Sequence, residues 1–275
     1  MIAVWLAASA LLVVGCVKDS PEALGPSFAD SLYAARCGAS LHYTTAEKLM
    51  LQIPFLRLPL TDKPLAYKTV RLSGPDVSVV PSQIRITEGS QARDLQALTF
   101  VAEAELGAGD HIIDSLSISF WDGSEGIWNI GTWRIKVIPP PAMRPPVSIG
   151  KCTLSAGHLD YYSLELTNTG DALMTINDFV FELPGVVLDR IVPGGGGRTE
   201  QRPRLSPGET RTLEFWFGRT SAAPDASHYF YFVVKPLLLV QAGEVESAVV
   251  LPPAMYFPVL TEELLTHIKS TGKRE

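Results

Sequence analysis

The stretch that decides the fold is residues 113–138, IDSLSISFWDGSEGIWNIGTWRIKVI. In its first half Leu116, Ile118 and Phe120 alternate with serines. A period of two puts apolar side chains on one face of a β-strand and polar ones on the other, which is typical of a sandwich strand with one wet face. Residues 122–126, DGSEG, predict a turn, and residues 128–138 predict the strand that returns beside the first.

Segments of the same kind continue on both sides of this hairpin. Each is short and rich in β-branched and aromatic residues, and turn-forming residues separate them. The clearest turns are residues 168–171, NTGD, and residues 207–209, PGE. Between residues 161 and 217 the order of strands and turns resembles the immunoglobulin-like modules of bacterial surface proteins, which implies β-sandwiches.

The clearest domain boundary is the proline-rich stretch 139–146, PPPAMRPP. Proline lacks the amide donor that a sheet requires, so this stretch is expected to be a semi-rigid spacer. We therefore expect an all-β protein with two tandem immunoglobulin-like β-sandwich domains, residues 37–138 and 147–258. A short C-terminal α-helix with its tail, within residues 259–275, completes the expected organisation.

The C-terminal helix is predicted from its ends. Thr261 is a good N-cap, acidic residues follow it directly, and Lys269 lies near the end, so caps and charges suit the helix dipole. An apolar stripe runs along this segment: Leu260, Leu264, Leu265 and Ile268. We expect the stripe to pack on the second domain; a helix that docks on a partner or lies on a membrane surface is the alternative.

The composition excludes one class of partner. Hydrophobic residues make up 46% of the 275 residues and charged residues 19%, which suits a packed globular protein. The formal net charge is -6, and the densest basic cluster lies at the tail, in residues 269–274. Because nucleic-acid binding uses clustered Lys and Arg against phosphates, no nucleic-acid partner is expected.

An unbroken run of apolar and small residues occupies positions 2–15. A helix requires about 20 apolar residues to cross a bilayer, so this run is too short to anchor the chain and is typical of the core of a signal peptide. No Lys or Arg precedes it, so the amino terminus supplies the only positive charge there. The run ends in Val13-Val14-Gly15-Cys16, which resembles a bacterial lipobox.

The lipobox resemblance implies export, cleavage after Gly15 and diacylglycerol on the Cys16 thiol. More than one acyl chain gives stable anchoring, whereas a single chain binds only marginally. Residues 1–15 are then a signal peptide, and residues 16–36 are a polar tether that lifts the body off the lipid. Val17 after the cysteine is by family habit compatible with an outer membrane, so the expected location is the cell membrane or outer membrane. An ordinary signal peptide with a chance cysteine is the alternative.

Three cysteines are far too few for a disulfide scaffold. With Cys16 assigned to lipid, Cys37 and Cys152 remain, and in an oxidising compartment they can pair. Such a bond would clamp the start of the first domain to the first strand of the second. Two buried free thiols are the alternative interpretation.

No residue pattern in the chain predicts catalysis. None of the five histidines lies in an HExxH motif, and no GxSxG elbow occurs. The glycine run 194–197 lacks the Lys-Ser/Thr ending and the following helix of a phosphate loop, so it is expected to be a mobile loop between strands. We therefore predict a protein that is not an enzyme and has no cofactor or metal site.

The tryptophans are the strongest candidates for ligand contact. Trp121, Trp128 and Trp133 are candidates for a platform that stacks on sugar rings, with packing in the core as the alternative. Our main hypothesis is a lipid-anchored protein that binds another envelope protein or has a structural role in the envelope. A module for cell-wall glycan is one alternative, and an accessory subunit of an envelope enzyme or transporter is another.

Overall fold

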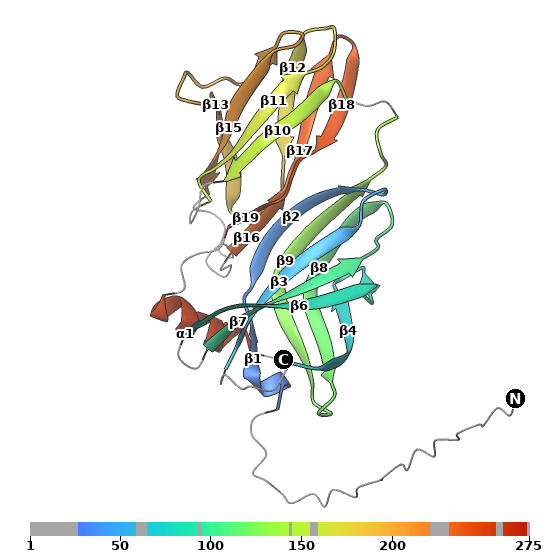
Figure 1. Cartoon of the computed structure of the whole chain (residues 1–275), viewed down its shortest axis with the longest axis vertical. Coiled ribbons are helices and arrows are strands. Elements are labelled where there is room, and N and C mark those ends of the chain that lie inside the picture. Colours follow the sequence, from blue (N-terminus) through green and yellow to red (C-terminus); the bar gives the residue numbers. More distant parts are fainter. Residues whose placement is uncertain are drawn as a thin grey trace, which may run out of the picture.

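The computed structural model describes residues 27–58, 65–92, 95–142, 145–154, 159–220, 231–256 and 261–273. Strands dominate these residues, which also include one 3-10 helix, η1 (Ala29–Ser31), and one α-helix, α1 (Glu262–Thr271). The prediction of an all-β protein is therefore confirmed. Figure 1 shows two β-rich bodies that follow one another along the long axis of the molecule.

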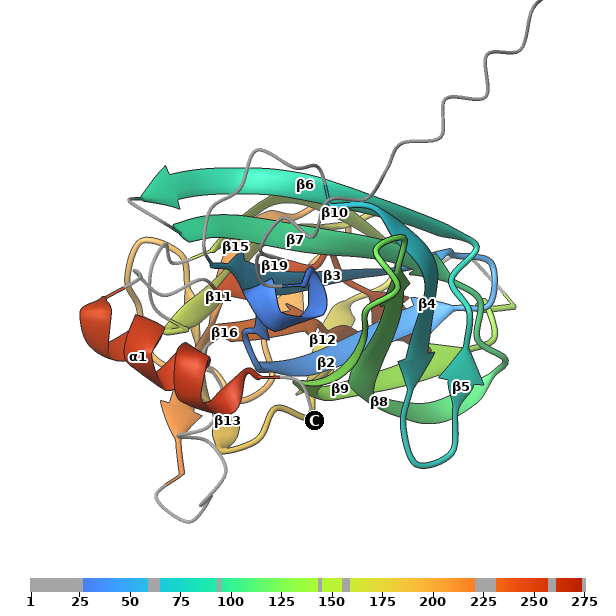
Figure 2. The same ribbon diagram turned by 90° about the horizontal axis from the view of Figure 1, so that it is seen from below.

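The lower body in Figure 1, here called the first sandwich, consists of two facing sheets. The smaller sheet has the order β1-β3-β7-β6, with strands Leu32–Ala34, Leu49–Arg57, Leu95–Ala104 and Gln83–Ala92. The larger has the order β19-β16-β2-β9-β8-β4-β5, with strands Ala254–Tyr256, Tyr231–Lys235, Cys37–Thr44, Glu125–Ile138, Gly109–Phe120, Tyr67–Ser73 and Ser78–Val79. Figure 2 shows β6 and β7 in one layer and β2, β9 and β8 in the other. One apolar core, here called the first core, lies between the layers.

The predicted central hairpin forms as β8 and β9, and its alternation holds. Leu116, Ile118 and Phe120 are at most 1% exposed and belong to the first core. The turn between the strands closes with a hydrogen bond of 3.2 Å from the Gly123 N–H to the Phe120 carbonyl. Gly123 has a φ of 86°, a left-handed conformation that favours glycine at this position of the turn.

The upper body, here called the second sandwich, also has two sheets. The order β10-β11-β15-β13 joins strands Val147–Leu154, Tyr161–Asn168, Thr210–Arg219 and Val186–Pro193. The order β14-β12-β17-β18 joins strands Arg204–Leu205, Met174–Val180, Leu237–Ala242 and Val245–Val250. Between them lies a second core, in which the rings of Phe179 and Phe215 stack with centroids 4.2 Å apart.

Strand β16 is shared by the two sandwiches through its packing. It belongs to the larger sheet of the first sandwich, although its residues lie within 147–258, the range expected for the second domain. The chain enters the first sandwich as β16, parallel to β2, and after Pro236 continues as β17 of the second sandwich. All five residues of β16 are buried. Tyr231 and Val233 join the first core, whereas Phe232 and Val234 join the second. Because both faces of β16 are apolar, alternation along the sequence cannot show which sheet it enters.

The C-terminal helix forms where its caps predict it, but it packs elsewhere. The Leu264 N–H donates to Thr261 Oγ1 at 3.2 Å, which confirms the N-cap. Ile268 is buried in the first core, and the Ala34 N–H of β1 donates to the Gly272 carbonyl at 2.8 Å. The prediction that the helix packs on the second domain is wrong, because β19 returns the chain to the first sandwich just before it. Within the described residues, no helix combines the length and apolar character required to span a bilayer.

Candidate functional site

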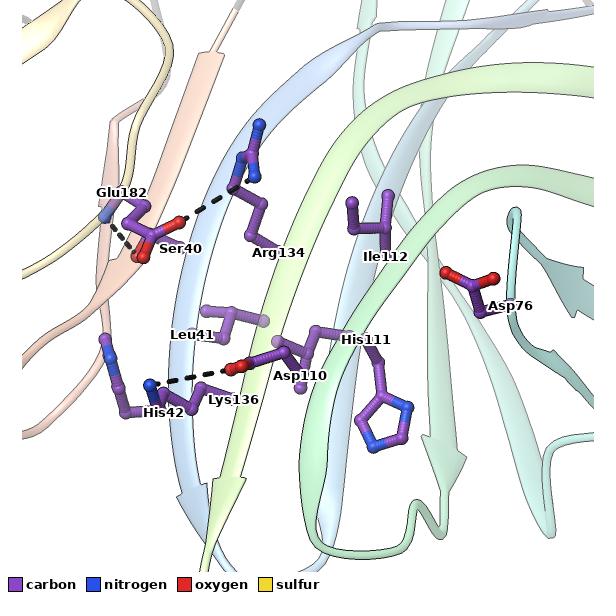
Figure 3. A pocket seen from close by; sticks show the side chains of 11 residues that line it. Ser40, Leu41, His42, Asp76, Asp110, His111, Ile112, Arg134, Lys136 and Glu182 are labelled. Carbon is purple, nitrogen blue, oxygen red and sulfur yellow. Dashed lines mark hydrogen bonds and ion pairs between the residues drawn. The ribbon is translucent and has the colours of Figure 1, made fainter.

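A cleft of about 320 Å³ lies on the outer face of the larger sheet of the first sandwich. Its walls are polar and charged side chains of β2, β9 and β8, together with Asp76 from the β4–β5 connection and Glu182 from the segment that follows β12. Figure 3 shows Glu182 reaching toward the sheet from the side of the second sandwich. The cleft therefore lies where the two sandwiches meet.

The period of two in the strands places the charged residues on the cleft side. On β9, Ile135 and Val137 lie in the first core, so Arg134 and Lys136 face outward. The parallel register pairs Ser40 of β2 with Arg134. The antiparallel register on the other side pairs Asp110 of β8 with Lys136. One row of polar groups, His42, Lys136 and Asp110, therefore crosses three strands, and a shorter one, Ser40 and Arg134, crosses two.

The charged groups of the cleft are paired loosely. Arg134 Nη1 lies 3.7 Å from Glu182 Oε2, and Lys136 Nζ lies 3.6 Å from Asp110 Oδ1. The four side chains are between 46% and 79% exposed. Ion pairs of this kind contribute little to stability, typically below about 1 kcal/mol, because water screens them. The same charges are therefore free to exchange these partners for those of an external molecule.

The backbone of Glu182 is fixed more firmly than its carboxylate. Its N–H donates to Ser40 Oγ at 2.8 Å, so the segment after β12 is hydrogen-bonded to β2 of the other sandwich. Gly38, two residues earlier on β2, is close to Phe232 and Pro184. A Cβ added at Gly38 would lie 2.9 Å from Phe232 Cδ1, so a larger residue there would force the Phe232 ring to move. These contacts hold the cleft in shape.

A partly buried polar cluster adjoins the cleft through His42. Lys235 at the end of β16 donates to Glu47 Oε1 at 2.7 Å, and its Nζ lies 3.6 Å from the centroid of the Tyr43 ring. The Lys235 carbonyl is 3.1 Å from His42 Nδ1. Burial lowers the pKa of His42 and raises the pKa of Tyr43 to about 12. Burial also opposes ionisation of Glu47, but its hydrogen bonds from Lys235 and Thr44 outweigh that effect and lower the pKa of Glu47.

The histidines and the serine of the cleft are hydrogen-bonded to backbone groups. His42 Nδ1 and His111 Nε2 each contact a backbone carbonyl, that of Lys235 and that of Gly107. The Ser40 hydroxyl accepts the Glu182 N–H. Among the described residues, no three His, Cys, Asp or Glu side chains lie close enough together to hold a metal ion.

The three predicted tryptophans do not form a platform. Trp128 and Trp133 are 0% exposed, and their Nε1 atoms donate to the carbonyls of Leu32 and Ile130, both at 3.2 Å. Only Trp121, in the β8–β9 turn, is exposed, at 68%. The platform prediction is therefore wrong, and the alternative of core packing holds for Trp128 and Trp133.

Trp216, the remaining tryptophan of the body, lies in a cross-strand row that the sequence did not reveal. The register places Tyr161 of β11 on one side of it and Arg190 of β13 on the other. The Tyr161 ring centroid is 5.0 Å from that of Trp216, and the Arg190 guanidinium lies 4.9 Å from the Trp216 ring centroid. Since neighbours flank the indole on both sides, its faces are occupied from within the chain.

The two body cysteines are free thiols. Cys37 is buried in the first core, whereas Cys152 is half-buried beside the second. Burial raises the pKa of both thiols, which disfavours the reactive thiolate. The predicted disulfide is not formed, because each cysteine packs with the core of its own sandwich. Cys16 lies outside the described residues.

Comparison with models of known protein families gives no match, and no curated protein matches the chain.

Proposed function

We propose that this chain is a lipid-anchored, extracytoplasmic protein with two immunoglobulin-like domains that binds another protein of the cell envelope without catalysis. The lipobox resemblance at Cys16 supports the anchor. The two pairs of facing sheets support the sandwich assignment. The observation that carries the binding function is the cleft between the sandwiches. There Arg134 and Lys136 of β9, Asp110 of β8 and Glu182 after β12 are exposed and paired only loosely.

The charges of the cleft favour a partner surface that carries both signs. Two cations lie at the centre of the cleft on β9, and carboxylates lie on either side, Asp110 toward β8 and Glu182 toward the second sandwich. A partner that presents a carboxylate to the centre and a cation to the rim replaces each weak internal pair with an intermolecular one. Such complementarity contributes mainly to specificity and to the rate of association.

The experiment compares charge reversal inside and outside the cleft. The Arg134→Glu, Lys136→Glu double variant is used with the wild type as bait in cross-linking from envelope extracts. The matched control is Arg85→Glu, an exposed arginine on β6 of the opposite sheet. We expect a partner that the wild type and Arg85→Glu recover and the double variant does not. A partner recovered equally by all three proteins would place the interaction elsewhere, and no recovered partner would count against the function.

The anchor is tested separately by mass spectrometry of the mature N-terminus. We expect acyl chains on residue 16 and no residues before it. A mature chain with an unmodified Cys16 would contradict the anchor and leave the cleft unaffected. The glycan alternative loses support, because two of its three tryptophans are buried and Trp216 is flanked on both sides.

A further inference from the structure

Trp121 is the most exposed large apolar side chain of the described residues, at 68%. It lies in the β8–β9 turn. Its backbone N–H donates to the Ala66 carbonyl at 3.2 Å, so the backbone at this tip is fixed. The ammonium of the exposed Lys68 lies 5.4 Å from the centroid of its ring. The tip therefore presents an indole and a cation together.

The N-terminal end of the described chain is attached to the same turn. The Phe28 N–H donates to Asp122 Oδ2 at 3.0 Å, and the Ala29 N–H donates to Ser124 Oγ at 3.3 Å. The Phe28 ring lies 5.8 Å from the Phe120 ring. Figure 1 shows this turn at the end of the molecule remote from the second sandwich. Any attachment that reaches the body through residue 27 therefore reaches it beside Trp121.

The length of chain between Cys16 and residue 27 limits how far the turn can be from the anchor. Eleven peptide steps separate the two positions in the sequence. At full extension a chain covers at most about 3.3–3.6 Å per residue, which gives about 40 Å as the upper limit. Lipid on Cys16 thus confines this end of the first sandwich to the vicinity of the bilayer surface.

We propose that Trp121 and Lys68 form a membrane-contact tip that rests in the headgroup region of the bilayer. The inference rests on the proposed acylation of Cys16, which supplies the proximity. Tryptophan favours the membrane interface because its ring is apolar and its N–H is polar, and lysine can place its ammonium among lipid phosphates. The nearby Asp122 carboxylate is occupied internally, accepting from Phe28 and Ser124, so it is directed into the turn.

This contact would set the orientation of the whole molecule. With the tip on the membrane, the second sandwich extends away from it along the long axis seen in Figure 1. The cleft at the junction of the sandwiches is then held above the surface, where it can receive a partner.

The experiment measures quenching of tryptophan fluorescence by lipids brominated near the headgroup end of their acyl chains. The full mature lipoprotein is placed in phosphatidylcholine vesicles, and Trp121→Phe is compared with Trp216→Phe, which removes a tryptophan from the remote sandwich. We expect most of the lipid-dependent quenching to be lost in Trp121→Phe and kept in Trp216→Phe. Equal quenching in both variants, or none in the wild type with acylated Cys16, would overturn the proposal.

A second arm separates failure of the tip from failure of the anchor. If Cys16 is found unmodified, the anchor proposal fails, and the tip is tested with the mature chain coupled through the Cys16 thiol to maleimide-bearing lipid. A Cys152→Ala background leaves Cys16 as the reactive thiol, since Cys37 is fully buried. Quenching that depends on Trp121 in this preparation supports the tip on its own, and its absence rejects the tip.

Discussion

Gly131 decides the direction of the side chains in the second half of β9. Its φ is 89°, and a Cβ there would lie 2.2 Å from the Cys37 carbonyl oxygen. The register between β8 and β9 shifts nearby, between Ile113 and Ser115. As a result Trp128 and Trp133 both face the core although an odd number of steps separates them. Strict alternation from the sequence would have put one of the two rings outside.

We predict that Gly131→Ala destabilises the protein strongly. The substitution combines a left-handed backbone with a clash against backbone atoms of β2, and each such strained residue costs on the order of 1–3 kcal/mol. Urea unfolding followed by circular dichroism measures the loss. Gly107→Ala is the control, because a Cβ there meets nothing within 4 Å. Equal unfolding midpoints for the two variants would contradict the strain at Gly131.

His42 makes the stability of the junction depend on pH. Burial lowers its pKa, so the folded protein binds a proton less readily than the unfolded chain does. Folding favours the neutral form of His42. Its contribution to stability is therefore complete above the pKa of histidine in the unfolded chain, about 6.5, and is lost as the pH falls below that value. Lys136, Asp110 and Glu182 also influence His42.

We therefore expect the urea concentration at the unfolding midpoint to decrease as the pH is lowered from neutral to values just above the range in which carboxylates titrate. A His42→Gln variant should show a flatter profile in that window, because it has no proton to gain. The pKa of Glu47 is lowered in the folded protein, so Glu47 stabilises the fold at pH values above the usual pKa of a glutamate. That contribution is lost only at more acidic pH. An unchanged slope in His42→Gln would contradict the assignment to His42.

At the scale of elements, β16 is the strand on which both cores depend. Phe232 packs in the second core and contacts Gly38 of β2, while Tyr231 and Val233 pack in the first core. Removal of a buried Phe side chain costs about 3–5 kcal/mol. Because this ring lies at the junction, the loss should reach both sandwiches.

We predict that Phe232→Ala lowers amide protection in β9 of the first sandwich and in β15 of the second alike. Hydrogen exchange followed by mass spectrometry of peptides from the two strands tests this. Leu173→Ala serves as the control, since its side chain is 47% exposed. A loss of protection confined to one strand would show that the two sandwiches unfold independently.

The elements themselves were largely predictable, and their partners were not. Local patterns predicted the hairpin within residues 113–138 and the helix that begins after Thr261, because alternation and capping depend on residues close to one another in the sequence. The change of sheet at Pro236 and the packing of Ile268 in the first core depend on which sheet each segment joins, and neighbouring residues do not determine that. The apolar run that forms β16 and β17 therefore divides between two sheets at Pro236.

For the whole molecule, composition and pattern predicted an all-β fold, and they did not predict the cleft. Arg134, Asp110 and Glu182 are far apart in the sequence, and only the register of β8 and β9 and the position of the segment after β12 bring them together. Of the three tryptophans predicted as a platform, Trp128 and Trp133 pack in the core instead. Charges on the outer face of a strand give no local sign that they line a common hollow.

The shared strand β16 also has a consequence for the order in which the protein can mature. A ribosome releases β2 and β9 long before β16 and β19. Until residue 256 has been made, the larger sheet of the first sandwich therefore lacks an edge and its core lacks Tyr231. A prematurely terminated product cannot seal this interior. Closure of the first sandwich therefore waits for segments that follow β10 to β15 in the chain.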